Sequence, residues 1–208
     1  MAKKKSKKNW IKGHLKDPYV KLANKEKLKS RASFKLKQIN EKYKVIKSGD
    51  AVIDLGAAPG GWSQIAKGIL KDTGLIIALD LLPVTGVPGI KFILGDIYAD
   101  EVMAQVDDLL RESGRDKVEL VMSDMAPNLS GIAASDAARA NDLNMRALFY
   151  AEKYLAKKAS FVVKLFQNEY FKDYSNEVKK LFSSCSIYKP DASRQKSSEI
   201  YLVAKNKK

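Results

Sequence analysis

Residues 54–62 read Asp-Leu-Gly-Ala-Ala-Pro-Gly-Gly-Trp, and no other stretch says as much about the architecture. The run before it, Ala51-Val52-Ile53, is short, apolar and rich in β-branched residues, as a buried strand is. The glycines allow a sharp turn and a close approach to a ligand, because no Cβ intrudes. Helical spacing resumes from Trp62. A strand, a glycine-rich turn and a helix in this order are typical of an open α/β sheet that binds a nucleotide-like cofactor.

The spacing of these glycines narrows the choice of cofactor. Gly-x-x-x-Gly-Gly differs from the dinucleotide pattern Gly-x-Gly-x-x-Gly and from the phosphate loop Gly-x-x-x-x-Gly-Lys-Ser/Thr. Because the turn lacks the lysine of the phosphate loop, it has no group that favours a triphosphate. The pattern therefore favours S-adenosylmethionine, a nucleoside that carries a sulfonium and an amino-acid tail but no phosphate.

Predicted strands and helices alternate along the chain around this turn, which specifies a mostly parallel α/β sheet with helices on both faces. At the end of the chain, too few residues separate two strands for a crossover helix, so the last strand should be antiparallel. We therefore predict the seven-stranded sheet of a class I, Rossmann-like methyltransferase. The expected strands are 51–55, 75–79, 91–94, 119–123, 160–165, 185–188 and 199–204, and the expected helices are 30–44, 62–70, 100–111, 136–155 and 170–182.

Acidic residues follow several predicted strands, at the sheet edge where such folds bind ligands. Asp80 lies 19 residues after Gly61, the spacing of an acid that accepts hydrogen bonds from ribose hydroxyls. We expect Asp96 to bind the adenine amino group and Ile97 to cover the ring. A lone Asp after a strand is often only a helix cap. A set of four, Asp54, Asp80, Asp96 and Asp124, favours a ligand site. The predicted cofactor residues are Gly56, Gly60, Gly61, Trp62, Asp80, Leu81, Asp96, Ile97 and Asp124.

Length and charge indicate the organisation of the chain. The 208 residues suffice for one well-buried core, so we expect a single domain over residues 30–208. The formal net charge is +14, and residues 1–29 contribute most of it with 11 Lys against 2 acids. Such a segment is either a solvated tail or a phosphate-binding arm, and we expect a flexible arm that contacts RNA. Trp10, His14 and Tyr19 lie among its lysines and could stack on bases.

Composition argues against several other classes of protein. No apolar run approaches the ~18 residues of a membrane span, and the lysine-rich start is unlike a secretory signal. The only cysteine, Cys185, excludes an internal disulfide, and a single histidine excludes the usual zinc sites. We therefore expect a cytoplasmic protein that binds neither membrane nor metal, and a monomer.

A lysine stands in the otherwise apolar strand Ser160-Phe161-Val162-Val163-Lys164-Leu165-Phe166. Because burying an ammonium is costly, a lysine there reaches out to solvent, pairs with an acid or is held uncharged. Asp124 ends the neighbouring strand and is placed to pair with it. Glu199 begins the last strand, and Lys35 lies in the helix before the first strand.

With the segments around these four residues, the chain resembles the FtsJ/RrmJ family of ribose 2′-O-methyltransferases, and within it the bacterial branch that modifies the A-loop of 23S rRNA. The resemblance implies methylation of a uridine ribose in 23S rRNA of the large ribosomal subunit, with Lys35, Asp124, Lys164 and Glu199 as the catalytic tetrad. Ser33 departs from the aromatic residue or Ala that this branch often has, which we expect to affect packing or RNA contact. The matching segments are 30–36, 54–64, 123–128, 161–166, 189–194 and 198–199.

The chemistry of the ribose agrees with this resemblance. A 2′-hydroxyl is a weak acid, so methyl transfer needs a group that takes its proton. A lysine does so in its uncharged form, which desolvation or a neighbouring cation favours. We expect Lys164 to be the base and Lys35 the neighbouring cation. Asp124 would orient Lys164 and the methyl donor, and Glu199 with Lys35 would position the ribose.

Other functions are less consistent with the sequence. A base N-methyltransferase needs an aromatic residue after the fourth strand, and Asp124-Met125-Ala126-Pro127 lacks one. A cytosine C5-methyltransferase needs a cysteine nucleophile, and Cys185 falls in a late strand away from the cofactor. Two alternatives stay open: 2′-O-methylation of tRNA or another RNA by the same chemistry, and a non-enzymatic RNA-binding or ribosome-assembly factor.

Overall fold

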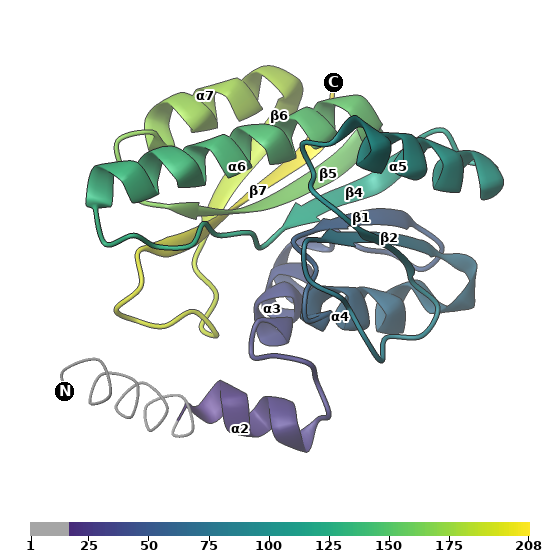
Figure 1. Cartoon of the computed structure of the whole chain (residues 1–208), viewed down its shortest axis with the longest axis horizontal. Helices are drawn as coiled ribbons and strands as arrows, with labels where there is room; N and C mark the ends of the chain where they lie inside the picture. Colours follow the sequence, from purple (N-terminus) through teal and green to yellow (C-terminus); the bar gives the residue numbers. More distant parts are fainter. Residues whose placement is uncertain (1–16) are drawn as a thin grey trace.

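One sheet of seven strands forms the centre of the computed structural model, which describes residues 17–208 (Figure 1). The strand order is β3-β2-β1-β4-β5-β7-β6. Strands β1 to β5 run parallel, and β7 is antiparallel to both of its neighbours, β5 and β6, which confirms the predicted sheet. The strands are β1 (Ala51–Leu55), β2 (Leu75–Asp80), β3 (Lys91–Leu94), β4 (Val118–Ser123), β5 (Leu155–Phe166), β6 (Phe182–Tyr188) and β7 (Glu199–Lys207).

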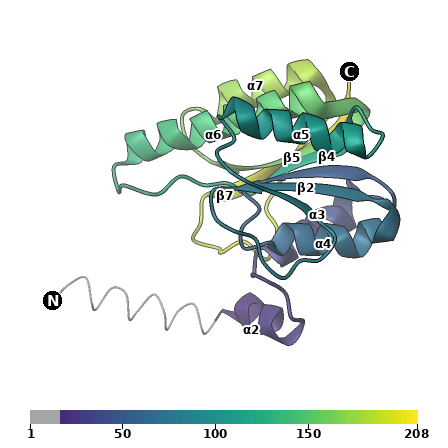
Figure 2. The same ribbon diagram turned by 45° about the vertical axis from the view of Figure 1, so that its right-hand side comes forward.

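Helices cover both faces of the sheet (Figures 1 and 2). Strand β1 shows how the sequence produces two layers, because all five of its residues are buried. Val52 joins the core on the side of α3 and α4, and Ile53 joins the core on the side of α5, α6 and α7. Alternate residues of a strand point to opposite faces, so a central parallel strand is apolar throughout. The helices are α3 (Ser33–Tyr43), α4 (Gly61–Leu70), α5 (Asp100–Glu112), α6 (Ala133–Tyr154) and α7 (Phe171–Leu181), with a short 3₁₀ helix, η1 (Lys71–Thr73), after α4.

The topology brings the predicted site residues to one edge of the sheet. Parallel strands end at the same edge, and in an open α/β sheet ligands bind there. Asp80 is the last residue of β2, Asp124 directly follows β4, and Lys164 lies near the carboxyl end of β5. Glu199 reaches the same edge from the other direction, because it begins the antiparallel strand β7.

The structure describes residues 17–29 of the expected basic arm, and its contact with RNA stays a prediction. Helix α2 (Pro18–Lys25) packs beside the domain, with Ala23 buried in a small cluster with Phe34 and Ala192. Asp17 caps this helix, accepting a hydrogen bond from the backbone N–H of Tyr19 at 3.0 Å. An Asp cap followed by a proline is a regular helix start. The lysine-rich composition of the segment concealed that signal.

Three aromatic residues of this segment, Trp10, His14 and Tyr19, were candidates for base stacking. The ring of Tyr19 lies 5.5 Å from that of Phe34, so it belongs to the packing of α2. Trp10 and His14 lie outside the described residues.

Two features of residues 17–208 concern a membrane and a metal ion. No helix in this range has both the length and the apolar character needed to cross a bilayer. No group of three or more His, Cys, Asp or Glu side chains is arranged there so that it could hold a metal ion.

Candidate active site

The glycine-rich turn after β1 forms one wall of a pocket of about 410 Å³ at the carboxyl edge of the sheet. A volume of this size is ordinary for a small-molecule site. At Gly56, φ is +74° and a Cβ would lie 2.3 Å from Cγ of Met125, so the turn needs glycine there. Of the predicted cofactor residues, those that line this pocket are Gly56, Asp80, Leu81, Asp96, Ile97 and Asp124.

Asp80 fixes the shape of this pocket through its carboxylate. One oxygen accepts a hydrogen bond from the backbone N–H of Ala58 at 2.8 Å, and the other accepts from that of Leu82, also at 2.8 Å. The carboxylate thereby ties the end of β2 to the glycine-rich turn. Each oxygen keeps a free lone pair, so the group can still accept hydrogen bonds from ribose hydroxyls.

The loop after β3 closes the pocket on the other side. Asp96 Oδ1 accepts a hydrogen bond from the backbone N–H of Tyr98 at 3.0 Å. The carbonyl of Ile97 accepts two hydrogen bonds, from Arg146 Nε at 2.8 Å and from the Tyr150 hydroxyl at 3.0 Å. Helix α6 therefore holds the segment that is expected to bind adenine. This contact was not predicted, because Arg146 is some 50 residues away from Ile97 in the chain.

Three predicted cofactor residues do not line the pocket, although they lie beside it. A Cβ on Gly60 would meet the side chains of Val84 and Val87 at 2.9 and 2.8 Å. A Cβ on Gly61 would lie 2.5 Å from Oγ of Ser30. Both glycines thus allow close packing around the start of α4. The N-cap of that helix, Gly60, has no capping side chain, and in the first turn the backbone N–H of Ser63 is bonded to the buried Asp54.

Trp62, the third of these residues, is buried. Its indole N–H donates to the carbonyl of Ala32 at 2.9 Å, and its ring lies 5.7 Å from the ring of Tyr201. The side chain therefore packs α4 against α3 and the sheet. A contact with the cofactor would have to come from the backbone.

Asp54, beneath the glycine turn, is fully buried, and Ser63 Oγ donates a hydrogen bond to its carboxyl at 2.6 Å. Burial, reinforced by the nearby Asp124 and Asp80, raises the pKa of Asp54 to about 7. Asp54 does not line the pocket, so it anchors α4 rather than contacting a ligand.

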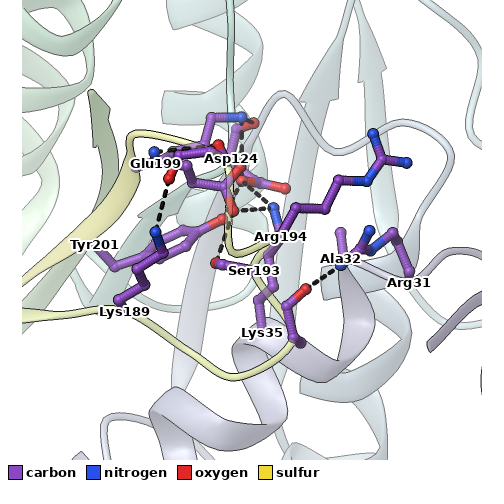
Figure 3. Close-up of polar contacts among 12 residues, drawn as sticks. Arg31, Ala32, Lys35, Asp124, Lys189, Ser193, Arg194, Glu199 and Tyr201 are labelled. Carbon is purple, nitrogen blue, oxygen red and sulfur yellow. Dashed lines mark hydrogen bonds and ion pairs between the residues drawn. The ribbon is translucent and has the colours of Figure 1, made fainter. Parts of the chain in front are cut away.

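The four residues of the predicted catalytic tetrad come together in the structure. Figure 3 labels three of them, Lys35, Asp124 and Glu199. Lys164 Nζ lies 3.2 Å from Oδ1 of Asp124, and Lys35 Nζ lies 3.8 Å from the same oxygen. Lys35 Nζ also lies 2.7 Å from Oε1 of Glu199. Both lysines are buried, so each ammonium or amine depends on these partners in place of water.

Strand register explains why these residues meet. Lys164 of β5 is paired with Tyr201 of β7, and Phe166 with Glu199. Glu199 and Tyr201 lie two residues apart, so they point to the same face of the sheet as Lys164. Helix α3 brings Lys35 to that face.

Two further residues hold the tetrad and were not predicted. The Tyr201 hydroxyl donates to Asp124 Oδ1 at 2.6 Å, and Ser193 Oγ donates to Glu199 Oε1 at 2.8 Å (Figure 3). Burial and the adjacent acids Asp124 and Glu199 raise the pKa of Tyr201 well above its usual range, so the phenol stays a donor. Tyr201 could have been predicted, because residues two apart in a strand point to the same face and Glu199 was already a candidate. It was missed because the apolar strand around it is typical of a buried core.

A second pocket, of about 440 Å³, opens beside the tetrad. It is lined by Arg31, Lys35, Arg194, Lys196, Ser197 and Glu199, four cations against one acid. Because Lys35 and Glu199 belong to the tetrad, this cationic pocket adjoins it directly. Asp124 belongs to both the tetrad and the cofactor pocket, which therefore meet at its carboxylate.

Cys185 lies in β6, at the end of the sheet order, and is half-buried. Burial raises the pKa of its thiol, which disfavours the nucleophilic thiolate. This placement agrees with a packing role.

The fold and the two adjoining pockets define a methyltransferase of the Rossmann-like class. Comparison with known families gives a match to the FtsJ-like methyltransferase model over residues 28–207. The chain therefore belongs to the FtsJ-like methyltransferase family, as the resemblance implied. S-adenosylmethionine, the cofactor predicted from the glycine spacing, is the methyl donor of such enzymes, and the lining of the pocket fits it.

Named relatives and solved structures agree with this placement. A Pseudomonas fluorescens protein named ribosomal RNA large subunit methyltransferase E is 44% identical over 205 residues, covering 99% of this chain and 97% of the relative. A Neisseria gonorrhoeae protein of the same name is 44% identical over 207 residues, covering 100% and 99%.

Among solved structures, a Plasmodium falciparum protein described as a ribosomal RNA methyltransferase is 25% identical, with a TM-score of 0.75 over 86% of this chain and 98% of that one. The fibrillarin of Aeropyrum pernix, solved with bound S-adenosyl-L-methionine, has a TM-score of 0.54 at 15% identity, covering 77% of this chain and 68% of that one, and shares the fold.

Proposed function

We propose that the protein methylates the ribose 2′-hydroxyl of a uridine in the A-loop of 23S rRNA, within the large ribosomal subunit, with Lys164 as the general base. The names of the 44%-identical relatives support ribosomal RNA as the substrate. The observation that carries the proposed chemistry is the pair of buried lysines, Lys35 and Lys164, that share Asp124 where the cofactor pocket meets the cationic pocket.

The cationic pocket supports RNA as the substrate. Phosphate oxygens are the groups that arginine and lysine bind most readily in nucleic acids. Arg194 and Lys196 would hold the backbone next to the acceptor ribose, and Ser197 offers a hydroxyl to the same groups. Contacts of this kind position the ribose without reading the base.

Each residue of the tetrad has its own role in the proposed methyl transfer. Bound S-adenosylmethionine supplies a methyl group on a sulfonium, which is a good leaving group. Lys164 Nζ takes the proton of the 2′-hydroxyl as the oxygen attacks, and Asp124 stabilises the resulting ammonium. Lys35 and Glu199, paired at 2.7 Å, hold the ribose in line with the methyl carbon and sulfur. Correct placement of this kind contributes up to ~7–11 kcal/mol to catalysis.

A Lys164→Met variant tests the assignment of the base. It keeps most of the side-chain volume and leaves Asp124 with its partners Tyr201 and Lys35. Loss of a general base lowers the rate about 10²–10⁴-fold. Lys153→Met is the matched control. Lys153 also pairs with an acid, Asp107 at 3.0 Å, but this pair joins helices α6 and α5.

The wild type and both variants are incubated with labelled S-adenosylmethionine and with large ribosomal subunits, free 23S rRNA or tRNA. Transfer of the labelled methyl group to each RNA is measured. We expect the wild type and Lys153→Met to label ribosomal RNA, and Lys164→Met to label it about 10²–10⁴-fold more slowly. Normal methylation by Lys164→Met would refute the base assignment. Labelling of tRNA alone would favour the tRNA alternative, and no labelling of any RNA would favour a non-enzymatic factor.

A further inference from the structure

A concave surface of about 510 Å³ lies at the edge of the sheet opposite the tetrad. The turn after α3, the amino end of β5 and the carboxyl end of β7 form it, and we call it the far-edge pocket. Strand β5 connects the two edges, with Lys158 near its amino end and Lys164 near its carboxyl end. At ~3.3 Å per residue, the stretch between them spans about 20 Å.

The far-edge pocket carries an excess of positive charge. Its lysines are Lys44, Lys47, Lys157, Lys158 and Lys205. Within residues 17–208, none of their ammonium groups forms an ion pair with a carboxylate. Two acids also line the pocket, so the five lysines outnumber the carboxylates. Asp50 accepts a hydrogen bond from the backbone N–H of Lys47 at 2.7 Å, and Glu119 accepts one from that of Ala51 at 2.6 Å.

A bulge in the sheet presents two of these lysines. Between the pairs Val118↔Leu155 and Leu120↔Ser160, β4 has one residue and β5 has four. The surplus residues leave the strand ladder, and Lys157 and Lys158 are exposed as a result. Bulges are specific features of a sheet and often lie next to functional sites.

The backbone around the pocket is also strained. Lys44, Lys158 and Asn206 have φ values of 53°, 64° and 59°, in the left-handed region. Lys44 ends helix α3, where this conformation is common. Asn adopts this conformation more readily than most residues, so Asn206 needs no further reason. Lys158 has no such reason, and glycine would adopt the conformation at lower cost. Strain retained at this position points to a requirement for the lysine side chain.

We propose that the far-edge pocket binds the phosphate backbone of a second RNA segment, distant from the nucleotide that is methylated. This inference rests on the proposed function in taking RNA as the substrate. Lysine ammonium groups bind phosphate oxygens as mobile point charges and read no sequence. Because the two edges face away from each other, one short loop does not reach both. The far-edge pocket therefore selects a large folded RNA over a short fragment.

The test removes the charge of the bulge. Lys157→Gln/Lys158→Gln is compared with the wild type and with Lys179→Gln/Lys180→Gln, another exposed pair of adjacent lysines, on α7. Binding to full-length 23S rRNA and to a hairpin carrying only the A-loop is measured without cofactor between about 50 and about 200 mM salt. Thermal melting checks that each variant is folded.

We expect Lys157→Gln/Lys158→Gln to bind the long RNA about tenfold more weakly, with a salt slope reduced by about 2, and to bind the hairpin like the wild type. The control pair should match the wild type on both RNAs. Wild-type affinity and slope for the bulge variant on the long RNA would overturn the inference, as would an equal loss on both RNAs.

A further probe separates RNA from an acidic protein partner. If polyglutamate binds the wild type and the bulge variant loses that binding while its RNA binding is unchanged, the far-edge pocket serves an acidic protein and the inference fails. The methylation assay is separate from these measurements. The wild type could methylate no ribosomal RNA while the bulge variant still binds the long RNA more weakly than the wild type. That pair of results would refute the proposed function and leave this inference standing.

Discussion

Asp124 is the residue that connects cofactor and substrate. It lines the cofactor pocket, and its Oδ1 lies 3.2 Å from Lys164, 3.8 Å from Lys35 and 2.6 Å from the Tyr201 hydroxyl. The Tyr201 hydroxyl is a neutral donor, because burial and the nearby acids raise its pKa well above its usual range. It can therefore orient the carboxylate without adding a charge next to the proposed base.

A Tyr201→Phe variant isolates that orienting role. Hydrogen bonds to charged groups contribute about 1.5–3 kcal/mol, so we expect kcat to fall about 10- to 100-fold, with a smaller change in KM for S-adenosylmethionine. Tyr174→Phe is the control, because Tyr174 is also buried and donates its hydroxyl to a carbonyl, that of Asn144 at 3.0 Å. Steady-state kinetics and thermal melting of both variants decide the matter. Equal kcat values in the two variants would contradict the role of Tyr201.

Asp54 predicts a pH dependence of stability. Its pKa is about 7 in the folded protein and about 3.8 when exposed, so the folded state binds the proton more tightly. Stability is therefore lost as the pH rises from about 4 to about 7, at about 1.4 kcal/mol per pH unit. Asp54→Asn has no such loss, so its free energy of unfolding should gain about 2–3 kcal/mol on the wild type between pH 5 and pH 8. Urea unfolding at both values measures this, and a constant difference between the proteins would refute it.

The residues of the site were predictable to different degrees. Lys164 was detectable because a lysine in an apolar strand needs a partner, and Asp80 because its distance from the glycine turn is characteristic. The predicted cofactor contact of Trp62 remains a prediction, since its side chain is buried between α4 and Tyr201. Arg146 was not predictable. Its partner is a backbone carbonyl, which leaves no trace in the sequence.

Helix α4 illustrates how a single element serves the site. A Cβ on its first residue, Gly61, would lie 2.5 Å from Oγ of Ser30, just before α3, and 2.9 Å from Oγ of Ser33, the first residue of α3. Gly68 on the same helix has no atom within 4 Å of such a Cβ. Gly68→Ala should therefore stabilise the protein by about 0.5–1 kcal/mol, the usual gain from glycine to alanine in a helix.

Gly61→Ala should instead destabilise the protein by about 1–3 kcal/mol through overpacking, and it should weaken cofactor binding because α4 shifts from the turn. Chemical denaturation measures both variants, and titration with S-adenosylmethionine gives the affinity. If Gly61→Ala were as stable as Gly68→Ala, the packing account of this glycine would be wrong.

Helices and strands with a regular pattern of apolar residues were predicted well. Elements that depend on contacts distant in the sequence were not. The five parallel strands and the helices between them follow from apolar periodicity. Strand β5 begins at Leu155 rather than at 160, because a bulge interrupts the period that the prediction relied on. Helix α2 depends on Arg31, which pairs with Asp17 and donates to the carbonyl of Ala192, a contact that spans most of the chain.

Charge, rather than shape alone, defines the two ends of the molecule. The cationic pocket beside the tetrad and the far-edge pocket lie at opposite edges of one sheet. The net charge is +14, and each of these two pockets holds more cations than acids. The sequence predicted a polyanionic partner, but only the fold separates its cations into two surfaces.

The chemical position of the transferred methyl group tests the central claim most directly. Large-subunit RNA labelled by the protein with methyl-labelled S-adenosylmethionine is hydrolysed in alkali, which cleaves next to every free 2′-hydroxyl. A 2′-O-methyl group blocks that cleavage. We predict that the label appears in alkali-resistant dinucleotides and that the Lys164→Met variant produces them about 10²–10⁴-fold more slowly. Label in mononucleotides would place the methyl on a base and contradict the account.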